Sequence, residues 1–327
     1  MTQRILDIGG LNVRFATEDG EVAAVSDVSL HVNKGECLGI VGESGSGKSQ
    51  TFMAVMGLLA ANGKTTGSAR FGGVDLLKAD ERTLNSVRGN RLAMVFQDPM
   101  TSLTPHMRVG RQLTEVLERH RGMDAKAARA EAVTMMARVQ IPEPERRFAM
   151  HPHELSGGLR QRIVLAMALL CGPELVIADE PTTALDVTVQ ALILDLMREL
   201  KEKHGTSFVL ITHDLGVVAG LADRVAVMYA GRVVENAGVR EIFAAPRHPY
   251  TKGLLACTPR LTDAPTAVLP TIPGQPPDLQ KLPPGCSFHP RCAAVFDRCR
   301  AERPALAEGG TLNACFLNHT VTAVGAA

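Results

Sequence analysis

The sequence lacks an excess of charge of either sign. Its 327 residues include 35 Lys or Arg and 34 Asp or Glu, which gives a formal net charge of +1. Because no net field would draw the chain towards a polyanion, its composition gives no support for a nucleic-acid partner or an anionic membrane surface. With 45% hydrophobic residues, the chain can form one large globular domain with an appendage, or two domains.

The sequence also lacks a segment that would carry it into or across a membrane. Its start, MTQRILDIGG, has neither the basic end nor the apolar stretch of a secretory signal. The longest apolar run, which begins at Ile163, is about half the length that spans a bilayer. We therefore expect a soluble, cytosolic chain, in which glutathione disfavours structural disulfides.

Short apolar runs alternate with helical segments along most of the chain. The runs at residues 36–42, 175–180 and 207–214 are typical of buried strands, and the Ala-rich segment from Asp124 to Gln140 predicts a helix. A second helix is expected before Gly205, with one apolar face made of Val189, Leu192, Ile193, Leu196 and Leu200. The alternation predicts an α/β fold whose mainly parallel sheet is covered on both sides.

The composition changes near residue 246. Eight prolines lie between Pro259 and Pro284, which excludes a regular helix or sheet ladder there and favours an extended arm held by contacts. A small C-terminal module follows, and it contains four of the seven cysteines.

A phosphate-binding loop is predicted near the start of the chain. GESGSGKS, from Gly42 to Ser49, fits the pattern G-x-x-x-x-G-K-[ST] and lies between an expected strand and an expected helix, which makes a chance glycine-rich turn improbable. Backbone N–H groups and the helix start would bind phosphates, Lys48 would bridge the β- and γ-phosphates, and Ser49 would ligate Mg²⁺. The predicted ATP-binding residues here are Gly42, Ser44, Gly45, Ser46, Gly47, Lys48, Ser49 and Gln50.

A pair of carboxylates ends a later strand. In LVIADEP the apolar run finishes at Asp179 and Glu180, at the sheet edge where the phosphate loop is also expected. Asp179 can hold Mg²⁺ through its water shell, and Glu180 can orient or deprotonate the attacking water. A surface Asp-Glu at a strand end is common by itself, but the phosphate loop favours the catalytic interpretation.

A third group of motifs points to a family. HELSGGLRQR (His153 to Arg162), ADEPTTALD and ITHD follow in this order, and the combination resembles the nucleotide-binding subunits of ABC transporters. The resemblance implies a P-loop ATPase with an N-terminal antiparallel β part and an inserted helical subdomain at about 98–160. It also implies a head-to-tail dimer, in which each ATP lies between one subunit's phosphate loop and the other subunit's LSGG motif.

The resemblance assigns roles to single residues. Gln97 would contact Mg²⁺ and the attacking water, and His213 would lie at the γ-phosphate, although a lone histidine at a strand end is more often structural. Phe15 would stack on adenine, with an ordinary core phenylalanine as the alternative. The residues expected to face the partner subunit and its ATP are Ser156, Gly157, Gly158 and Asp186.

Three further stretches resemble one branch of that family, the ATPase subunits of dipeptide, oligopeptide and nickel importers. They are QDPMTSLTPHMRVGRQL, EPTTALDVTVQALIL and FAAPRHPYTKGLL. The resemblance implies an ATPase domain at 1–245 and a C-terminal extension at 246–327. It also implies a second ATPase subunit, two permease subunits, an external substrate-binding protein, and a peripheral location on the cytoplasmic face of the inner membrane.

Peptides are the expected cargo in this branch, and nickel, opines or short sugars are alternatives that an ATPase sequence cannot exclude. A soluble ABC ATPase that acts on nucleic acid or ribosomes is a further alternative. It is disfavoured because the sequence shows no long coiled-coil insertion and no basic patch.

The clustered cysteines are Cys286, Cys292, Cys299 and Cys315. Their spacing fits structural zinc poorly, since such sites usually include a pair separated by two to four residues, and by itself it leaves an iron–sulfur cluster, zinc and unligated thiols open. The resemblance to peptide importers implies a [4Fe–4S] cluster, with a structural role in a module that has little core. The remaining cysteines, Cys37, Cys171 and Cys257, are expected to be small core residues.

Overall fold

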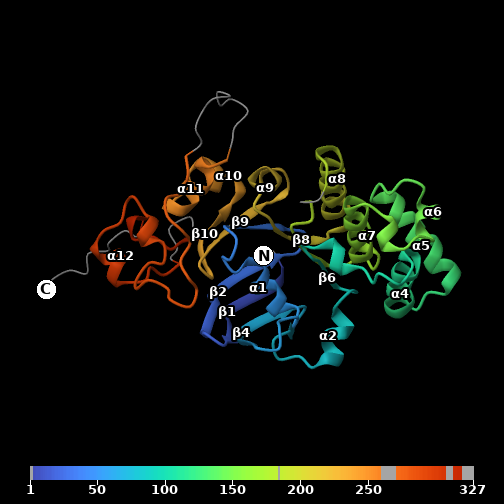
Figure 1. Cartoon of the computed structure of the whole chain (residues 1–327), viewed down its shortest axis with the longest axis horizontal. Helices are drawn as coiled ribbons and strands as arrows, with labels where there is room; N and C mark the ends of the chain where they lie inside the picture. The colour runs from blue at the N-terminus through green and yellow to red at the C-terminus, as the bar shows by residue number, and fades with distance from the viewer. Residues whose placement is uncertain (1–2, 183–184, 259–269, 307–311, 319–327) are drawn as a thin grey trace.

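The computed structural model describes residues 3–182, 185–258, 270–306 and 312–318. Figure 1 shows an elongated molecule, with the sheets in the middle, a group of helices at one end and the C-terminal module at the other. The helices are α1 Lys48–Val55, α2 Glu81–Val87, α3 Pro99–Ser102, α4 Val109–Arg121, α5 Ala125–Arg138, α6 Pro144–Phe148, α7 Gly157–Leu169, α8 Val187–His204, α9 Leu215–Leu221, α10 Val239–Ala244, α11 Pro249–Ala256 and α12 Asp297–Ala301.

The described strands form a seven-stranded and a four-stranded sheet. The larger sheet has the order β11 Leu312–Asn313, β10 Arg232–Gly238, β9 Arg224–Tyr229, β3 Cys37–Val41, β8 Ser207–Ile211, β7 Leu175–Asp179 and β6 Leu92–Val95. The run from β9 to β6 is parallel, whereas β10 and β11 are antiparallel additions. The smaller, antiparallel sheet has the order β2 Gly20–Asn33, β1 Arg4–Thr17, β4 Gly63–Phe71 and β5 Val74–Asp75. The predicted α/β fold with a parallel core and an antiparallel N-terminal part is confirmed.

The parallel sheet is buried on both faces, as predicted for strands that are apolar throughout. In β7, Val176 and Ala178 belong to the hydrophobic cluster formed with α4, α5, α7, α8 and α9. Leu175 and Ile177 belong to a second cluster, formed with the antiparallel sheet and α1. One face is therefore covered by helices and the other mainly by a second sheet.

Short polar signals define the ends of the two helices that the sequence predicted. The predicted helix at 124–140 is α5, and the carboxylate of Asp124 caps it by accepting hydrogen bonds from the N–H groups of Lys126 and Ala127, both at 2.9 Å. Asp186 caps α8 in the same way, and α8 ends at Gly205, whose φ of 67° lies in the left-handed region.

The expected apolar face of α8 needs one correction. Ile193, Leu196 and Leu200 are buried as predicted, whereas Leu192 is 41% exposed. The buried stripe continues through Met197 instead, because positions 193, 196, 197 and 200 repeat at the helical period while 192 lies at the edge of that face.

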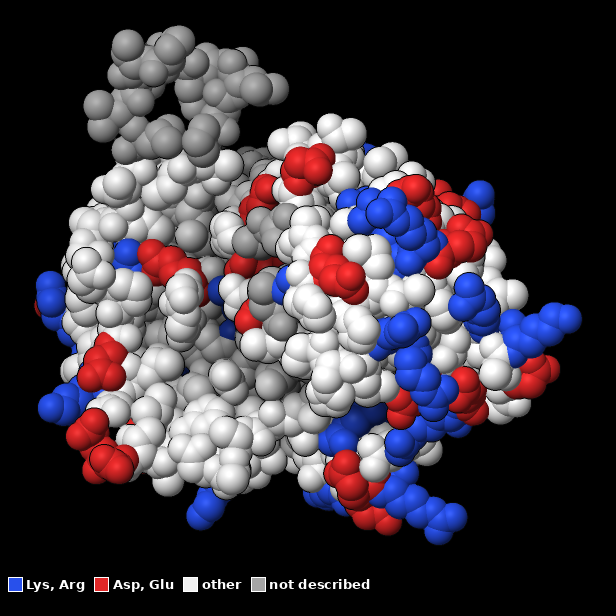
Figure 2. Space-filling view, turned by 45° about the vertical axis from the view of Figure 1, so that its right-hand side comes forward, with Lys and Arg blue, Asp and Glu red and all other residues white. Residues whose placement is uncertain are grey.

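The helical end of the molecule follows β6. Figure 1 shows α4, α5 and α6 together at the side of the molecule away from the C-terminal module. Figure 2 shows Lys and Arg interspersed with Asp and Glu over this end, so the face in view has no patch of a single charge. Within the described residues, no helix is long and apolar enough to span a membrane.

The proline-rich segment is described only from residue 270 onward. Residues 270–284 form neither helix nor strand, as predicted for this stretch. The remaining part of the prediction, at 259–269, lies outside the described residues.

The two adjacent positions on α8 give a matched test of the packing. Ile193→Ala removes a fully buried side chain, and we expect it to lower the free energy of unfolding by about 3 kcal/mol. Leu192→Ala removes an exposed side chain and should change it by less than about 0.5 kcal/mol. Denaturant unfolding of the purified chain measures both, and similar losses at the two positions would contradict the assigned face.

Candidate nucleotide-binding site

Three neighbouring strands bring the predicted motifs to one sheet edge. β3 and β7 both pair with β8 in parallel, and Ile211 of β8 lies beside Ile40 of β3 and Asp179 of β7. The segments after these strands therefore meet at the carboxyl edge. There they line one cavity of about 400 Å³, whose lining residues are Gly42, Glu43, Ser44, Gly45, Ser46, Gly47, Lys48, Ser49, Gln50, Gln97, Asp179, Glu180 and His213.

The phosphate loop needs glycine where its backbone meets other strands. A Cβ atom at Gly42 would lie 2.2 Å from the carbonyl oxygen of Met228, and one at Gly47 would lie 2.4 Å from that of Ala24. Gly47 also has a φ of 93°, a conformation that other residues rarely adopt. The loop is therefore packed directly on β9 and β2, which fixes its shape.

Lys48 lies inside the curve of its own loop. Its ammonium donates hydrogen bonds to the carbonyl oxygens of Gly42 at 2.8 Å and Glu43 at 2.9 Å. Burial lowers the pKa of Lys48, while the carboxylates of Glu180, Asp179 and Glu43 act in the opposite direction. The hydroxyl of Ser46 is buried without a hydrogen-bond partner among the described residues, so an oxygen of a bound phosphate would satisfy it.

The predicted Mg²⁺ ligands lie next to each other. The Ser49 side chain forms a hydrogen bond with the Asp179 carboxylate. Burial raises the pKa of Asp179, and the Ser49 hydrogen bond and the charge of Lys48 counteract the rise. Gln97 lines the same cavity from the segment after β6. Hydroxyl, carboxylate and amide oxygens are the donors that Mg²⁺ prefers, so this set fits the cation.

The predicted catalytic carboxylate is paired with the predicted histidine. Oε1 of Glu180 lies 3.1 Å from Nδ1 of His213. The side chain of Glu180 is 14% exposed and that of His213 is 65% exposed, so the histidine lies at the open side of the pair. Glu180 also has a φ of 48°, a strained conformation for a residue other than glycine, and such strain is typical of functional positions.

The residues expected to serve the partner's ATP do not line this cavity. Ser156 caps α7 by accepting a hydrogen bond from the N–H of Leu159 at 3.4 Å, and Gly157 and Gly158 form the first turn of that helix. Asp186 caps α8 and is followed by Val187, which is 84% exposed. Their roles across a dimer stay predictions.

Phe15 is half-buried on β1 and packs against the second hydrophobic cluster, which lies between the parallel and antiparallel sheets. A Cβ atom at Gly63 would lie 2.8 Å from its ring. Phe15 does not line the cavity, and its stacking on adenine stays a prediction.

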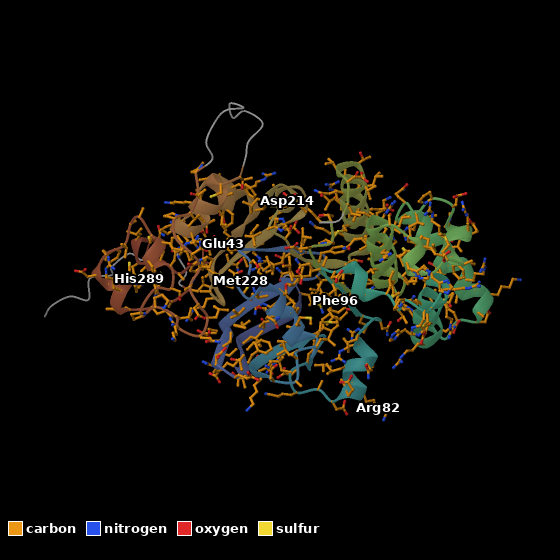
Figure 3. All side chains as sticks on the ribbon, viewed as in Figure 1. Glu43, Arg82, Phe96, Asp214, Met228 and His289 are labelled. Atoms are coloured by element: carbon orange, nitrogen blue, oxygen red, sulfur yellow. The ribbon has the colours of Figure 1, made fainter. Side chains whose placement is uncertain are left out.

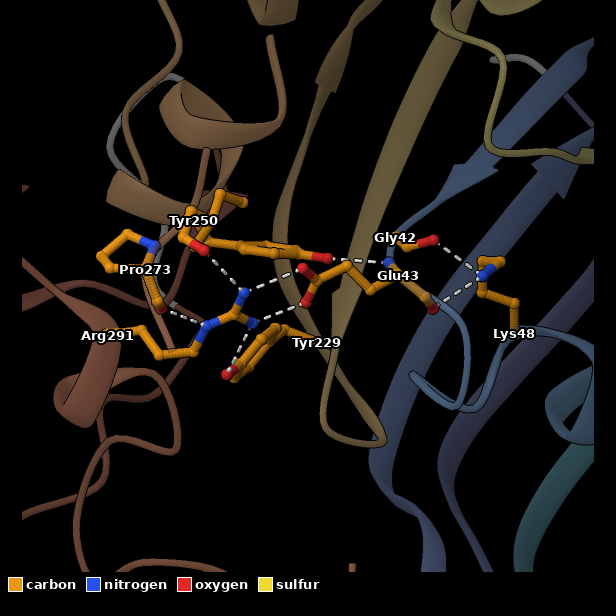
Figure 4. A network of polar contacts seen from close by, with 8 residues as sticks. Gly42, Glu43, Lys48, Tyr229, Tyr250, Pro273 and Arg291 are labelled. Atoms are coloured by element: carbon orange, nitrogen blue, oxygen red, sulfur yellow. Dashed lines mark hydrogen bonds and ion pairs between the residues drawn. The ribbon is translucent and has the colours of Figure 1, made fainter. Parts of the chain in front are cut away.

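Sequence reasoning missed a contact between the phosphate loop and the C-terminal module. Figure 4 shows Arg291 and Tyr250 next to Glu43, the second residue of the loop motif. The loop motif accepts any residue at this position, and Arg291 is distant in the sequence, so no local signal could have paired the two. Only the folded structure identifies Glu43 in the loop and the buried Arg291, which lies between two cysteines, as partners.

The four clustered cysteines line one small cavity of about 20 Å³, together with His248, His289 and neighbouring apolar residues. Burial raises the pKa of the Cys286 and Cys292 thiols, and it raises that of Cys315 to about 11. Among the described residues, however, no group of three or more His, Cys, Asp or Glu side chains is arranged to hold a metal ion. The four thiols nevertheless line one common space. Of the other cysteines, Cys37 and Cys171 are buried core residues as predicted, and Cys257 is only partly buried.

Comparisons with known proteins agree with this geometry. Residues 25–183 match the family model described as ABC transporter, and residues 234–299 match the model described as oligopeptide/dipeptide transporter, C-terminal region. The dimeric ATP-binding cassette MJ0796, solved with ADP and phosphate, superposes with a TM-score of 0.66 at 27% identity and covers 72% of this chain and 99% of its own. The fold and the site thus define the ATPase of an ABC transporter.

The match to curated relatives is more specific. The oligopeptide transport ATP-binding protein OppD of Salmonella typhimurium is 55% identical over 313 residues, which are 95% of this chain and 93% of that protein. OppD of Haemophilus influenzae is 53% identical over 315 residues, 96% and 97% of the two chains. The chain belongs to this family of oligopeptide-transporter ATP-binding subunits, as its motifs indicated.

The loop geometry predicts the effect of one added methyl group. Gly47→Ala forces a strained φ and a 2.4 Å contact with the Ala24 carbonyl, so we expect affinity for a fluorescent ATP analogue to fall at least about tenfold. Gly220→Ala, in α9, is the control, because the new Cβ would meet no atom within 4 Å apart from its chain neighbours and its own helix backbone, and it should bind as the wild type does. Unchanged affinity in Gly47→Ala would show that the nucleotide does not depend on this loop.

Proposed function

We propose that this chain hydrolyses ATP at the cytoplasmic face of the inner membrane to power the import of di- and oligopeptides. One observation carries the proposal. The phosphate loop, Asp179, Glu180 and His213 line a single cavity in a chain that is 55% identical to an oligopeptide transport ATP-binding protein. This arrangement supports a phosphate site, a cation site and a catalytic base that share one space.

The residues that line the cavity are proposed to have different roles in phosphoryl transfer to water. The loop N–H groups and Lys48 would hold the β- and γ-phosphates, while Ser49, Asp179 and Gln97 would hold Mg²⁺, which neutralises charge on the phosphates. Glu180 would orient the attacking water and accept its proton as the bond from the γ-phosphorus to the bridging oxygen breaks. His213, beside Glu180, would contact the γ-phosphate.

A second ATPase subunit is proposed to complete the site. Asp186 and the LSGG residues Ser156, Gly157 and Gly158 lie outside the cavity of their own chain, as a role towards another subunit's ATP requires. Next to Asp186, Val187 is 84% exposed and Leu192 is 41% exposed. Large apolar side chains beside a predicted partner-facing residue support a protein contact there. The partner is proposed to be a different ATPase subunit of the same transporter.

The permease contact is proposed to lie beside Gln97. Phe96 is exposed next to it and is labelled in Figure 3 between the sheet and the helical end. A cavity of about 460 Å³ is lined by Ser102, Thr104 and Met107, which follow Gln97 in the chain, together with residues of α2 and α4. A permease segment bound there would respond to movement of Gln97 when ATP binds. The substrate-binding protein would act only through the permeases.

The extension at 246–327 is proposed as a separate module that adds to the ATPase domain at 1–245 and its helical subdomain at about 98–160.

The four cysteines are proposed to hold a [4Fe–4S] cluster. Their thiols surround one cavity, which supports a common ligand. The cluster would supply bonds that tie the module together, since its segments carry little regular structure and little core. Because thiols must lose protons to bind it, loading should improve as pH rises towards the raised pKa values of Cys286, Cys292 and Cys315.

The catalytic proposal is tested by Glu180→Gln. The amide keeps the shape of the side chain but cannot accept the proton, so we expect kcat for ATP hydrolysis to fall by at least about 100-fold while ATP binding is retained. Glu199→Gln, which alters a surface ion pair with Lys203 on α8, is the matched control and should keep wild-type turnover. Normal hydrolysis by Glu180→Gln would refute the assigned role.

The cluster proposal is tested by anaerobic purification. We expect a coloured protein with about four irons and four acid-labile sulfides per chain. Cys286→Ser and Cys315→Ser should lose most of the iron, whereas Cys257→Ser, outside the cavity, should keep it. Colourless protein with stoichiometric zinc would contradict the proposal.

A further inference from the structure

The second residue of the phosphate loop is bound by the C-terminal module. Arg291 donates two parallel hydrogen bonds to the carboxylate of Glu43, from Nη1 to Oε2 at 2.6 Å and from Nη2 to Oε1 at 3.0 Å (Figure 4). Such two-point pairing of a guanidinium with a carboxylate fixes both distance and orientation. In Figure 3, Glu43 lies near the centre of the molecule, and His289, two residues before Arg291, lies in the module.

Arg291 is itself held in place on its other sides. It is 7% exposed, and its Nε donates to the carbonyl oxygen of Pro273 at 2.9 Å. Its guanidinium also lies over the ring of Tyr229, with 5.9 Å from Cζ to the ring centre. The guanidinium is therefore shielded from water, whereas the Glu43 side chain is 27% exposed, and the contacts of Arg291 restrict its movement with the loop.

A second contact from the same region holds the backbone of Glu43. Its N–H donates to the hydroxyl oxygen of Tyr250 at 2.8 Å. Tyr250 is fully buried, with its ring centre 4.6 Å from that of Tyr229 and 5.4 Å from that of Phe288. Phe288 lies between Cys286 and Cys292, so the aromatic cluster joins the cysteine module to the loop.

The residue held in this way also contacts the phosphate-binding lysine. The carbonyl oxygen of Glu43 accepts hydrogen bonds from Nζ of Lys48 at 2.9 Å and from the N–H of Ser46 at 3.2 Å. Glu43 is thus held by the C-terminal extension, through its side chain by Arg291 and through its N–H by Tyr250, and its carbonyl group contacts Lys48. A continuous set of polar contacts runs from Arg291 to Lys48.

We propose that Arg291 is a positioning residue of the ATP site, which holds Glu43 so that the phosphate loop is already formed before nucleotide binds. The C-terminal module is then part of the nucleotide-binding machinery in addition to any role within the transporter. The inference rests on the proposed function of the loop as the ATP site. A preformed loop avoids the ordering cost that binding would otherwise carry, so losing the contact should weaken ATP binding.

The test compares variants of the full-length chain in titrations with a fluorescent ATP analogue and Mg²⁺. Arg291→Gln and Glu43→Gln remove the ion pair from opposite sides, and we expect each to weaken binding about tenfold. Arg291→Lys should recover only part of the loss, because an ammonium cannot form two parallel bonds. Glu302→Gln is the matched control, since it breaks an exposed ion pair with Arg298 in the same module and should bind as the wild type does.

The KM and kcat of steady-state hydrolysis distinguish a positioning role of Arg291 from a smaller fraction of folded protein. The loop contacts nucleotide in both the ground state and the transition state, so the KM for ATP should rise while kcat stays within about twofold. Partial unfolding would instead lower apparent kcat at unchanged KM. If Arg291→Gln does not fold, the KM and kcat of Glu43→Gln test the same contact from the other side. The double variant should lose no more affinity for ATP than the weaker-binding single variant does, because both changes remove one ion pair.

Lys48→Ala distinguishes this inference from the proposed function. If Lys48→Ala loses nucleotide while both Arg291→Gln and Glu43→Gln bind as the wild type does, the positioning role is wrong and the ATP site stands. If Lys48→Ala also binds as the wild type does, the ATP site itself is misassigned.

Discussion

The parallel pairing of β8 with β3 on one side and β7 on the other is the constraint on which the site depends. Each of these strands is buried and almost wholly apolar, so its first functional groups appear where the strand ends. Parallel pairing places those ends side by side, which brings Lys48, Asp179 and His213 around one cavity from positions far apart in the chain. The packing of Gly42 on Met228 and of Gly47 on Ala24 then gives the phosphate loop its shape.

The parts of this site that could be predicted from the sequence are those with a local pattern. The loop motif and the carboxylates at the end of β7 each follow an apolar run, so strand periodicity and residue type were sufficient to place them. His213 was assigned by the resemblance to a family, because a lone histidine after a strand is more often structural. The face of α8 was predicted except at Leu192, where a boundary position turned out to be exposed. The pairing of Arg291 with Glu43 could not be predicted, because it depends on how the extension packs back onto the sheet.

Two of the contacts that join the described part of the extension to the ATPase domain lie on either side of the cysteine cavity. β11 pairs with β10, where Asn313 lies opposite Glu235, and the buried carboxylate of Glu235 accepts hydrogen bonds from the N–H groups of Arg247 and His248. Arg291 makes the other connection, at Glu43. The cysteine cavity lies between them, lined by His248 and by the residues that flank Arg291. A ligand held by the cysteines would therefore also stabilise the segment that carries Arg291.

The most direct test of this account is amide hydrogen exchange across the phosphate loop, residues 43–49, without nucleotide. The full-length wild type and Arg291→Gln are compared, and the amides of α5 serve as an internal reference because that helix lies at the far end of the molecule (Figure 1). The account predicts faster exchange at the loop in the variant and unchanged exchange in α5. Equal exchange at the loop in both proteins would contradict the claim that the C-terminal module holds the ATP site in shape.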